Sequence, residues 1–564
     1  MSVLGKNWKI INADPGKNIV QKVLENRGLV DPDKVQAFLK TNYKKGLHNP
    51  FLIKNMDRAV ERIKNAIEKK EKIMVFGDYD VDGISGTAIL VQTLRLLGAR
   101  VSYRLPHRVN DGYGLSIKFV DEFADIGVNV LITVDCGVSC ATQIDHAKKR
   151  GIDVVVTDHH TIPETFPDSA YAVLHTLQPG DEYPFKGLTG AAVAYKLACA
   201  LLTDKFEKEE RENYLYSLLD LASLGTVADL GPLVGENRII VKYGLEALQK
   251  TRWPGLNYLK EVSGIAPDTK LDISVIGFRL GPRINAAGRI DTPYYALQLL
   301  LYTEPNEKGK VLAEHLERLN LRRQQMVAKA IVEAEEDFLG RPGSDKIFIA
   351  WSPDWHVGIL GLIASKFVEK YNQPSMILQD FGDHLVASAR SPDTFNVVDA
   401  LTKHKDLLEN FGGHAQAAGF SIRKDKLPAF VDAMGKYATE ILPEQKPEQQ
   451  LLIDSELNEH EINENLLNFL EQMEPYGIGN EQPKFLLRSV TPSWIKKVGK
   501  ESQHLHFQVA GDQRRFSVIA FKFGDHEQLL QSAGKIDLVC YLNRNEWKGV
   551  TQVQLRAVDF KKAA

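Results

Sequence analysis

Residues 73–83 read Ile-Met-Val-Phe-Gly-Asp-Tyr-Asp-Val-Asp-Gly, an apolar run that passes directly into three carboxylates spaced two apart. The run from Ile73 to Phe76 predicts a buried strand that ends at a glycine-bounded acidic segment. Acids crowded at one strand end repel each other unless a cation or a proton relieves them. Asp78, Asp80 and Asp82 therefore indicate a metal site. Taken alone, the triplet also fits a solvated acidic turn.

Helices and strands alternate on both sides of this stretch. Apolar periodicity predicts helices over residues 56–71 and 87–97, and strands over residues 101–105, 128–134, 153–157 and 172–174. This alternation predicts an α/β fold, in which helices cover both faces of a parallel sheet. In such sheets, ligands bind at the carboxyl ends of the strands.

Two further strand ends carry acids and imidazoles. Asp135-Cys136-Gly137 follows one predicted strand, and Asp158-His159-His160 follows the next. A lone Asp after a strand is commonly a helix cap, and a lone His is commonly structural. Three strands of one sheet that all end in such groups are better explained by one metal-binding edge. Asp229, in a turn of small residues, is a weaker candidate for the same edge.

A basic segment and a long helix follow. The segment Gly-Pro-Arg-Ile-Asn-Ala-Ala-Gly, residues 281–288, predicts a glycine-flanked basic turn whose polar residues, with their neighbours, are Arg279, Arg283, Asn285 and Arg289. Arginine forks bind phosphate bidentately, whereas the alternative is a structural turn capped by surface arginines. Residues 311–338 predict one long amphipathic helix, and Gly340-Arg341-Pro342-Gly343 ends it at a domain boundary.

A second α/β unit is predicted from residue 347 to about residue 442, with strands over 347–351, 375–379 and 384–389. Ser388 and Arg390 lie at one strand end, and Gly412, Gly413 and His414 place a glycine pair beside an imidazole. Both segments suit an anionic group, because glycines let backbone N–H groups approach it closely.

The last hundred residues change character. Short alternating strands over 505–509, 515–520, 536–542 and 552–558 predict a small β-barrel, of which the oligonucleotide-binding (OB) fold is one candidate. The segment mixes cations with aromatics, as single-strand binders do: His504, His506, Phe507, Arg514, Arg515, Phe516, Lys522, Tyr541, Arg544 and Trp547. Ordinary core aromatics explain this composition equally well.

The composition is that of a soluble protein of two to four domains, with 564 residues, 44% hydrophobic and 25% charged. The net charge of −3 excludes a globally basic nucleic-acid coat but not a local basic groove. Four cysteines without a CxxC pair predict free thiols in a reducing cytoplasm. We expect no membrane segment, because no apolar run approaches eighteen residues.

The ordered segments GDYDVDG, VDCG, VVVTDHH and GTVADLGPL resemble the four motifs of the DHH phosphoesterase superfamily, named for the triplet at Asp158 to His160. GPRINAAGR, WHVGILGLIASKFVEKY and FGGHAQAAGF are similar to the RecJ family of single-strand-specific 5′→3′ DNA exonucleases and its companion DHHA1 domain. The resemblance covers roughly residues 50–560. It implies an N-terminal appendage (1–50), a DHH domain (51–310), a connecting helix (311–340), a DHHA1 domain (341–445) and an OB-like domain (446–564).

The resemblance also implies a site with two Mn²⁺ or Mg²⁺ ions. Asp135 would bridge them, Asp80 with Asp78 would hold one, and the other would be held by Asp82, His159 and Asp229. Asp158 and His160 would orient His159 or assist proton transfer to the leaving 3′-oxygen. Many superfamily members carry a histidine where this chain has Phe76, so that ligand position passes to Asp78.

For DNA, the resemblance implies a 5′-phosphate grip made by Arg108, Ser388 and Arg390, and places His414 and its glycines near the scissile phosphate. Under the long helix, a channel too narrow for a duplex would be lined by Arg283, Asn285 and Arg289, and Arg279 is a further implied contact to the DNA. The expected enzyme is a monomer that releases 5′-mononucleotides from single-stranded DNA in repair and recombination. A helicase and a single-strand-binding protein are its implied partners.

Two alternatives remain. A DHH phosphodiesterase acting on short oligoribonucleotides or cyclic dinucleotides would generally end after the companion domain, so the predicted barrel argues against it. A non-catalytic replication scaffold would derive from a decayed DHH core. The intact acids and His159 argue against decay, because a scaffold gains nothing from such charge crowding.

Overall fold

The computed structural model describes residues 2–112, 114–339, 346–444, 449–511, 514–547 and 550–563. The chain divides into two compact units. The larger unit comprises His48–Gly231 and Ile240–Gln445, and the smaller unit comprises Met1–Leu47, Pro232–Ile239 and Lys446–Ala564. The segment predicted as a separate N-terminal appendage thus shares a unit with the C-terminal strands.

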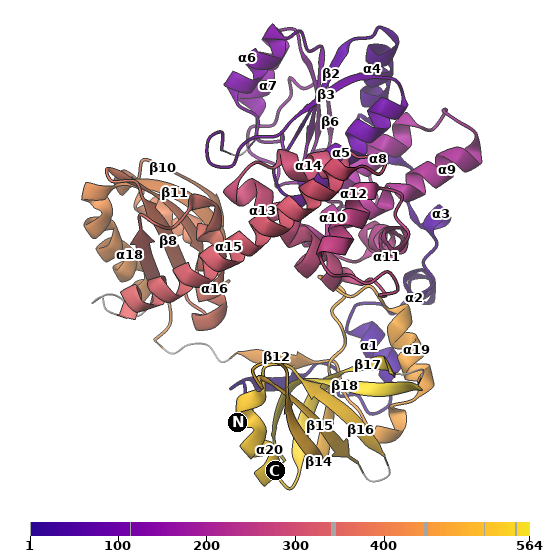
Figure 1. Ribbon diagram of the computed structural model, residues 1–564, viewed down its shortest axis with the longest axis vertical. Helices are drawn as coiled ribbons and strands as arrows, with labels where there is room; N and C mark the ends of the chain where they lie inside the picture. The colour runs from indigo at the N-terminus through magenta and orange to yellow at the C-terminus, as the bar shows by residue number, and fades with distance from the viewer. Residues whose placement is uncertain are drawn as a thin grey trace. The chain divides into compact units, whose positions relative to one another are not determined.

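The larger unit contains a five-stranded parallel sheet in the order β3-β2-β4-β5-β6, as the alternating pattern predicts. Its strands are β2 (Lys72–Gly77), β3 (Arg100–Arg104), β4 (Val130–Val134), β5 (Asp153–Thr157) and β6 (Ala172–Leu174). One face carries α6 (Ile117–Asp125) and α7 (Ala141–Lys149), and the other carries α4 (Met56–Glu68), α5 (Val81–Leu96) and α8 (Gly190–Leu201) (Figure 1). The chain leaves β2 toward β3 and returns across it to β4, which makes the β2–β4 boundary a topological switch point.

Burial explains the apolar strands. Every residue of β2 after Lys72 is buried, because helices cover both faces of the sheet. Helix α5 is buried along almost its whole length, between the sheet and the helices α8 and α10. Gly86 permits this packing, since a Cβ there would lie 2.7 Å from Val134 Cγ1. The start of α5 is therefore fixed against the strand ends.

A helical region follows the sheet. It consists of α9 (Lys208–Ser217), α10 (Leu219–Ala228), α11 (Gly235–Gln249), α12 (Pro254–Val262), a π-helical turn (Val275–Leu280), α13 (Gly281–Ile290), α14 (Tyr294–Leu300) and the long α15 (Glu307–Leu339). The prediction of a basic turn at residues 281–288 is wrong, because this segment is helix α13. Pro282 suits a first helical turn, and Gly288 serves close packing, since a Cβ there would lie 2.8 Å from Tyr79 O.

A second sheet in the larger unit has the order β10-β11-β9-β8-β7. Its elements are β7 (Phe348–Ser352), α16 (Val357–Tyr371), β8 (Ser375–Asp380), β9 (His384–Arg390), α17 (Val397–Lys403), β10 (Asn410–His414), β11 (Ala417–Arg423) and α18 (Leu427–Ile441). Strands β10 and β11 were not predicted, because the glycine pair at 412–413 is typical of a loop. Gly413 has φ +144°, and a Cβ there would lie 2.4 Å from Ala417 O, so the hairpin requires glycine at this position.

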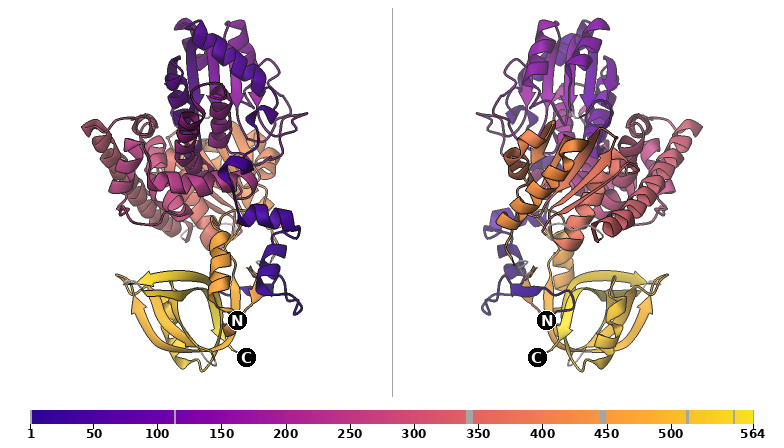
Figure 2. Two further views of the ribbon diagram at one scale, coloured as in Figure 1. Left: turned by 90° about the vertical axis from the view of Figure 1, so that its right-hand side faces the viewer. Right: turned by 90° about the vertical axis from the view of Figure 1, so that its left-hand side faces the viewer.

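The smaller unit contains a barrel that closes where β14 pairs with both β15 and β17, as the short alternating strands predict (Figure 2, yellow). From residue 446 onward, the strands of this unit are β12 (Gln450–Ile453), β13 (Ser455–Glu456), β14 (Phe485–Val498), β15 (His504–Ala510), β16 (Arg515–Ala520), β17 (Ile536–Trp547) and β18 (Val550–Lys562). Its helices are α1 (Ile19–Glu25), α2 (Pro32–Leu39), α3 (Tyr43–Gly46), α19 (Glu464–Gln472) and α20 (Glu527–Ser532). Strand β1 (Asn7–Ile10) pairs in parallel with β12.

No helix in the described part of the chain has the length and hydropathy that a membrane crossing requires.

Candidate metal centre

The predicted acids meet at the carboxyl edge of the parallel sheet. Asp78 follows β2, Asp135 follows β4 and Asp158 follows β5. The Asp78 amide donates to Val134 O at 3.2 Å, and the Asp135 amide donates to Thr157 O at 2.9 Å, so the strand pairing continues to the acids themselves. The carboxylates therefore lie at the topological switch point, where open α/β sheets bind their ligands.

The start of α5 adds two carboxylates. Asp80 is the N-cap and accepts hydrogen bonds from the amides of Asp82 (3.0 Å) and Gly83 (3.1 Å). The buried Asp82 carboxylate accepts from the amides of Gly190 (2.6 Å) and Ala191 (2.9 Å) at the N-terminus of α8. A Cβ at Gly190 would lie 2.6 Å from the Asp135 side chain, so glycine there lets α8 approach both acids.

Three sets of side chains are close enough to share a cation. The sets are Asp78, Asp80 and Asp135; Asp82, His159 and Asp229; and Asp135, His159 and His160, with ligand atoms within 4.8 Å of one another in each. Asp229 joins them as the C-cap of α10. Asp135 and His159 each belong to two sets, and His159 Nε2 lies 3.0 Å from Asp135 Oδ1, so these two residues connect the sets. The Asp135 φ of +60° is rare for a residue with a side chain and costs about 1–3 kcal/mol.

His159 shows that the residues fit a divalent cation. Its Nε2 lies 3.0 Å from Asp135 Oδ1, 3.5 Å from Asp229 Oδ2 and 3.7 Å from Asp82 Oδ2. This buried nitrogen makes no hydrogen bond to any described residue. Burial and the nearby His160 lower the pKa of His159 to about 4, which leaves the imidazole neutral. A neutral imidazole can present an unprotonated nitrogen to a cation, and one such nitrogen among three carboxylates suits Mn²⁺ or Mg²⁺ better than a structural zinc, which would usually recruit thiolates.

The pKa values of the acids indicate the same need for positive charge. Burial, reinforced by the neighbouring carboxylates, raises the pKa values of Asp78, Asp82 and Asp135 well above the usual range. The pKa of Asp229 is raised to about 7 by burial and by Asp80. A bound cation would reverse these shifts and allow all four carboxylates to ionise.

Asp158 and His160 form a pair of a different kind. Burial disfavours the Asp158 carboxylate, but the hydrogen bond from His160 Nδ1 at 2.8 Å, the positive charge of His160 and the backbone amides together outweigh it and lower the Asp158 pKa. The same bond, against the effect of burial, raises the pKa of His160 to about 9. Asp158 also accepts from the amides of Val138 (2.9 Å) and His159 (2.7 Å). Asp158 thus organises the segment that presents His159.

Four arginines of the larger unit lie close enough to act on one another: Arg108, Arg289, Arg323 and Arg390. The Arg108 guanidinium lies 3.9 Å from the centre of the Tyr79 ring, and Arg289 donates to Gly358 O at 3.1 Å. Arg390 donates to Ser388 Oγ at 3.1 Å. Burial and the charges of Arg108, Arg323 and Arg390 lower the pKa of Arg289 to about 9. Such mutual repulsion between guanidinium groups favours a phosphate between them.

Arg323 was not predicted as a site residue. The amphipathic pattern places it on the polar face of α15, but periodicity alone cannot say which polar residues approach the other arginines. Its guanidinium donates to Asn320 Oδ1 at 3.0 Å, and burial lowers its pKa.

Other predicted DNA ligands make internal contacts. Arg279 donates to the carbonyls of Ser263 (2.7 Å) and Gly264 (3.0 Å), just after α12. Arg283 pairs with Glu317 and donates to Arg279 O, while Asn285 lies half-buried on α13. The exposed residues Gly412, Gly413 and His414 end β10. Within the described chain, no hydrogen bond or ion pair connects His414 with the carboxylates.

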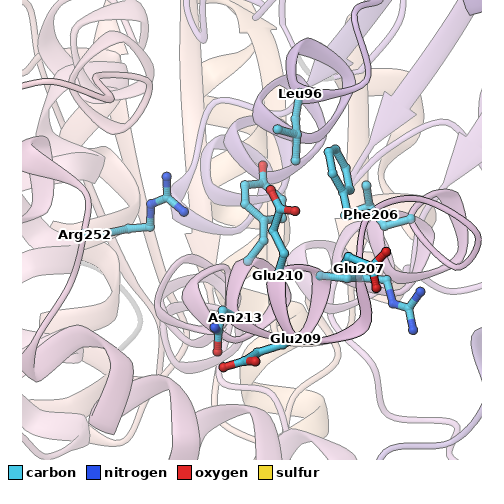
Figure 3. Close-up of a pocket in the computed structure, with 10 residues that line it drawn as sticks. Leu96, Phe206, Glu207, Glu209, Glu210, Asn213 and Arg252 are labelled. Carbon is cyan, nitrogen blue, oxygen red and sulfur yellow. The ribbon is translucent and has the colours of Figure 1, made fainter.

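A separate pocket of about 590 Å³ lies beside the far end of α5 (Figure 3). Leu96 and Phe206 form one side of it and Arg252 lies opposite, with Glu210 between them, and Glu207 and Glu209 also line it. Sixteen helical residues span about 24 Å, so α5 separates this pocket from Asp80 by about that distance. None of the residues predicted for the site lines this pocket.

The barrel aromatics named from the composition include core residues, as one of the two alternatives for this segment expects. Phe507 and Phe516 are buried in its core, and Arg544 forms ion pairs with Glu464 and Glu471. The side chain of Trp547 lies outside the described residues. Two other aromatics are exposed, Trp494 at 67% and Phe521 at 51%. Lys496 Nζ lies 5.7 Å from the Trp494 ring, which gives the surface a cation beside an aromatic face.

Family models match three segments of the chain. They are the DHH family N-terminal domain over residues 72–226, the DHHA1 domain over 344–440 and the RecJ OB domain over 453–559. The single-stranded-DNA-specific exonuclease RecJ of Bacillus subtilis is 33% identical over 96% of this chain and 67% of its own length. That of Salmonella typhimurium is 34% identical over 89% of each chain. The chain belongs to the RecJ family.

Solved RecJ structures agree with this assignment. RecJ of Thermus thermophilus in complex with Mn²⁺ is 29% identical, covers 99% of this chain and 80% of its own, and superposes with a TM-score of 0.81. A RecJ exonuclease bound to manganese is 34% identical over 70% of this chain and 96% of its own, with a TM-score of 0.61. The DHH, DHHA1 and OB architecture predicted from the sequence is confirmed, as are the metal-dependent enzyme class and Mn²⁺ or Mg²⁺ as its cofactors.

Proposed function

We propose that this protein is a single-strand-specific 5′→3′ DNA exonuclease that hydrolyses phosphodiester bonds with two Mn²⁺ or Mg²⁺ ions and releases 5′-mononucleotides. The observation that carries the proposal is the position of the neutral His159 ring. Its Nε2 lies within 3.7 Å of a carboxylate oxygen of each of Asp82, Asp135 and Asp229. A phosphate-binding arginine cluster in the same unit complements it. Together they supply a cation site and an anion site, both of which phosphodiester hydrolysis needs.

These ligands would divide between two cations. Asp78 and Asp80 would hold one ion, Asp82, His159 and Asp229 would hold the other, and we assign Asp135 as the ligand that both would share. Two divalent ions supply charge that activates water and stabilises the attacking and leaving oxygens. Asp158 holds His160 in its protonated form, and we assign His160 the transfer of a proton to the leaving 3′-oxygen.

We assign the terminal 5′-phosphate to the arginine cluster. Arg108, Arg289 and Arg390 would bind its oxygens, with Ser388 fixing the Arg390 fork and Arg323 adding charge. Gly361 on α16 leaves room for this fork, because a Cβ there would lie 2.8 Å from Arg390 Nη2. Gly412, Gly413 and His414 remain proposed contacts to the DNA backbone. We omit Arg279 and Arg283 from the phosphate grip, because carbonyls and Glu317 already engage them.

Replacing Arg390 by Met is expected to lower the ratio of activity on 5′-phosphate over 5′-hydroxyl strands about tenfold. One charge-assisted hydrogen bond contributes about 1.5–3 kcal/mol, and tenfold corresponds to about 1.4 kcal/mol. Digestion of matched oligonucleotides measures the ratio. Arg423→Met is the control, since this exposed arginine pairs only with Asp425 among the described residues and its loss should leave the ratio unchanged. An unchanged ratio in the Arg390 variant would contradict the grip.

One assay tests the activity against its alternatives. The protein is incubated with Mn²⁺ and an end-labelled long single strand, and in parallel with duplex DNA, RNA and a dinucleotide. We expect mononucleotides from the 5′ end of the single strand and little from the duplex. Preferred hydrolysis of the dinucleotide would instead indicate an oligoribonuclease or cyclic-dinucleotide phosphodiesterase. No hydrolysis of any substrate would indicate a non-catalytic replication scaffold.

Two exposed aromatics that the sequence did not single out, and the remaining sequence-based predictions, complete the proposal. Trp494 and Phe521 would stack on bases of the single strand, a role that suits exposed aromatics beside a lysine. We retain a monomeric enzyme that acts in DNA repair and recombination with a helicase and a single-strand-binding protein. The free thiols of its four cysteines suit the cytoplasm. We also retain domain boundaries near residues 50, 310, 340 and 445.

A further inference from the structure

A fully buried histidine, His175, contacts the backbone of the segment that carries His159 and His160. His175 follows β6 directly and is 0% exposed. Its Nδ1 accepts a hydrogen bond from the Leu177 amide at 3.0 Å, and its Nε2 lies 2.7 Å from His160 O. Because a nitrogen that accepts a hydrogen bond carries no proton, the neutral ring must be protonated on Nε2. His175 therefore donates to the His160 carbonyl.

With this hydrogen bond, the amide, the ring and the carbonyl of His160 each have a partner. Asp158 Oδ1 already engages the His160 amide at 3.2 Å and its Nδ1 at 2.8 Å. Asp158 therefore fixes the N-terminal side and the ring of His160, while His175 fixes the carbonyl on its C-terminal side. Since peptide groups are rigid planes, the two contacts together set the direction in which the His160 side chain leaves the backbone.

The turn that carries His175 is itself anchored. Gln178 Nε2 donates to Val173 O at 2.7 Å, and the Gln178 amide donates to His175 O at 3.2 Å. Farther along the same loop, Asp181 Oδ2 accepts from the Lys54 amide at 2.9 Å. His175 is thus held at a fixed point, so its donor sets the place of the His160 carbonyl rather than following it.

We propose that His175 is a positioning residue whose Nε2–H holds the Asp158-His159-His160 segment in the orientation that metal binding and catalysis require. The catalytic part of this role rests on the proposed nuclease function, whereas the metal-binding part does not. Hydrogen-bond partners of this outer kind commonly change metal affinity or activity about 10–100-fold when they are removed.

Comparison of His175→Met with His175→Gln tests the donor. Both replacements are unbranched and of similar length, and both lose the Nδ1 acceptor, but only Gln can donate to His160 O. We expect His175→Met to lower kcat about tenfold and to weaken Mn²⁺ binding about tenfold, with an unchanged KM for single-stranded DNA. His175→Gln should restore both values to within about twofold of the original chain. Steady-state kinetics and calorimetric titration of Mn²⁺ without DNA measure these quantities.

Gln178→Met is the matched control for loosening of the turn. It removes the side-chain bond to Val173 O but keeps the backbone bond from the Gln178 amide to His175 O and the contact of His175 with His160 O, so Tm should fall while kcat and Mn²⁺ affinity fall much less than in His175→Met. The proposal is overturned if His175→Met keeps the original Mn²⁺ affinity, or if His175→Gln loses as much affinity as His175→Met. If the original chain digests no DNA, the proposed function fails, and the Mn²⁺ titrations of the Met and Gln variants still decide the role of His175.

Discussion

Replacement of Asp135 by Asn is expected to reduce nuclease activity roughly 10²–10⁴-fold while the protein stays folded. Asp135 is buried between two of the three candidate cation sets, so its loss affects both ions. Loss of one preorganised group that stabilises charge in the transition state costs roughly 10²–10³ in kcat, and an effect on both ions extends the expected loss to about 10⁴. Mn²⁺-dependent digestion of a single strand, together with the Mn²⁺-induced change in Tm, measures the effect.

Asp220 offers the matched control for Asp135. It is also fully buried, and burial raises its pKa to about 7, but its Oδ2 accepts from Thr251 Oγ1 at 2.6 Å and it belongs to no cation set in the described chain. Asp220→Asn should lower Tm yet keep the response to Mn²⁺. Original rates in Asp135→Asn, or equal loss of the Mn²⁺ response in both variants, would contradict the two-metal assignment.

Stabilisation by Mn²⁺ should increase as the pH rises from 6 to 8. The folded pKa of Asp229 is about 7, above its ordinary 3.8, so the metal-free folded state binds more protons than the unfolded state and loses stability as pH rises toward 7. The pKa values of Asp78, Asp82 and Asp135 are raised as well, and the folded pKa of His160 is about 9 against an ordinary 6.5. These shifts have the same sign between pH 6 and pH 8, whereas the lowered pKa of His159, about 4 against an ordinary 6.5, opposes them only at the lower end of this range. A bound cation removes the repulsion between the ionised acids.

Thermal unfolding with EDTA and with Mn²⁺ across this pH range measures the effect. We expect the Tm of the metal-free protein to fall with pH and that of the Mn²⁺ form to change less. In Asp229→Asn, the decline of the metal-free form should be shallower, because one titrating group is gone. A Mn²⁺-induced change in Tm that is the same at pH 6 and pH 8 would show that these acids do not hold the ion.

The parallel sheet was predictable because its strands are buried on both faces and therefore form continuous apolar runs, as in residues 73–76 and 130–134. The basic segment 281–288 was misread as a turn, since its glycines suggest flexibility. In the fold, Gly288 instead makes room for the Tyr79 carbonyl, a contact between segments more than 200 residues apart. The hairpin β10–β11 was missed for the same reason.

The acids of the site were predictable because each directly follows a strand, so that local sequence places them at a common edge. The residues that hold these acids and their neighbours in place were not predictable. His175 also follows a strand, but the hydrogen bond that gives it a role is made to a backbone carbonyl that any residue would offer. The sequence alone does not distinguish the aromatic residues Trp494 and Phe507. In the fold, Trp494 is 67% exposed and Phe507 lies in the barrel core. Tertiary packing decides which aromatic residue is free to stack on a base.

The pairing of β1 with β12 has a consequence for synthesis of the chain. Asn7 leaves the ribosome about 440 residues before its partner Gln450. At about 5–20 residues per second, β1 must wait roughly 20–90 s for the strand that completes its sheet. Over that interval the larger unit emerges whole and can begin to fold, while the segment that was made first is among the last to find its place.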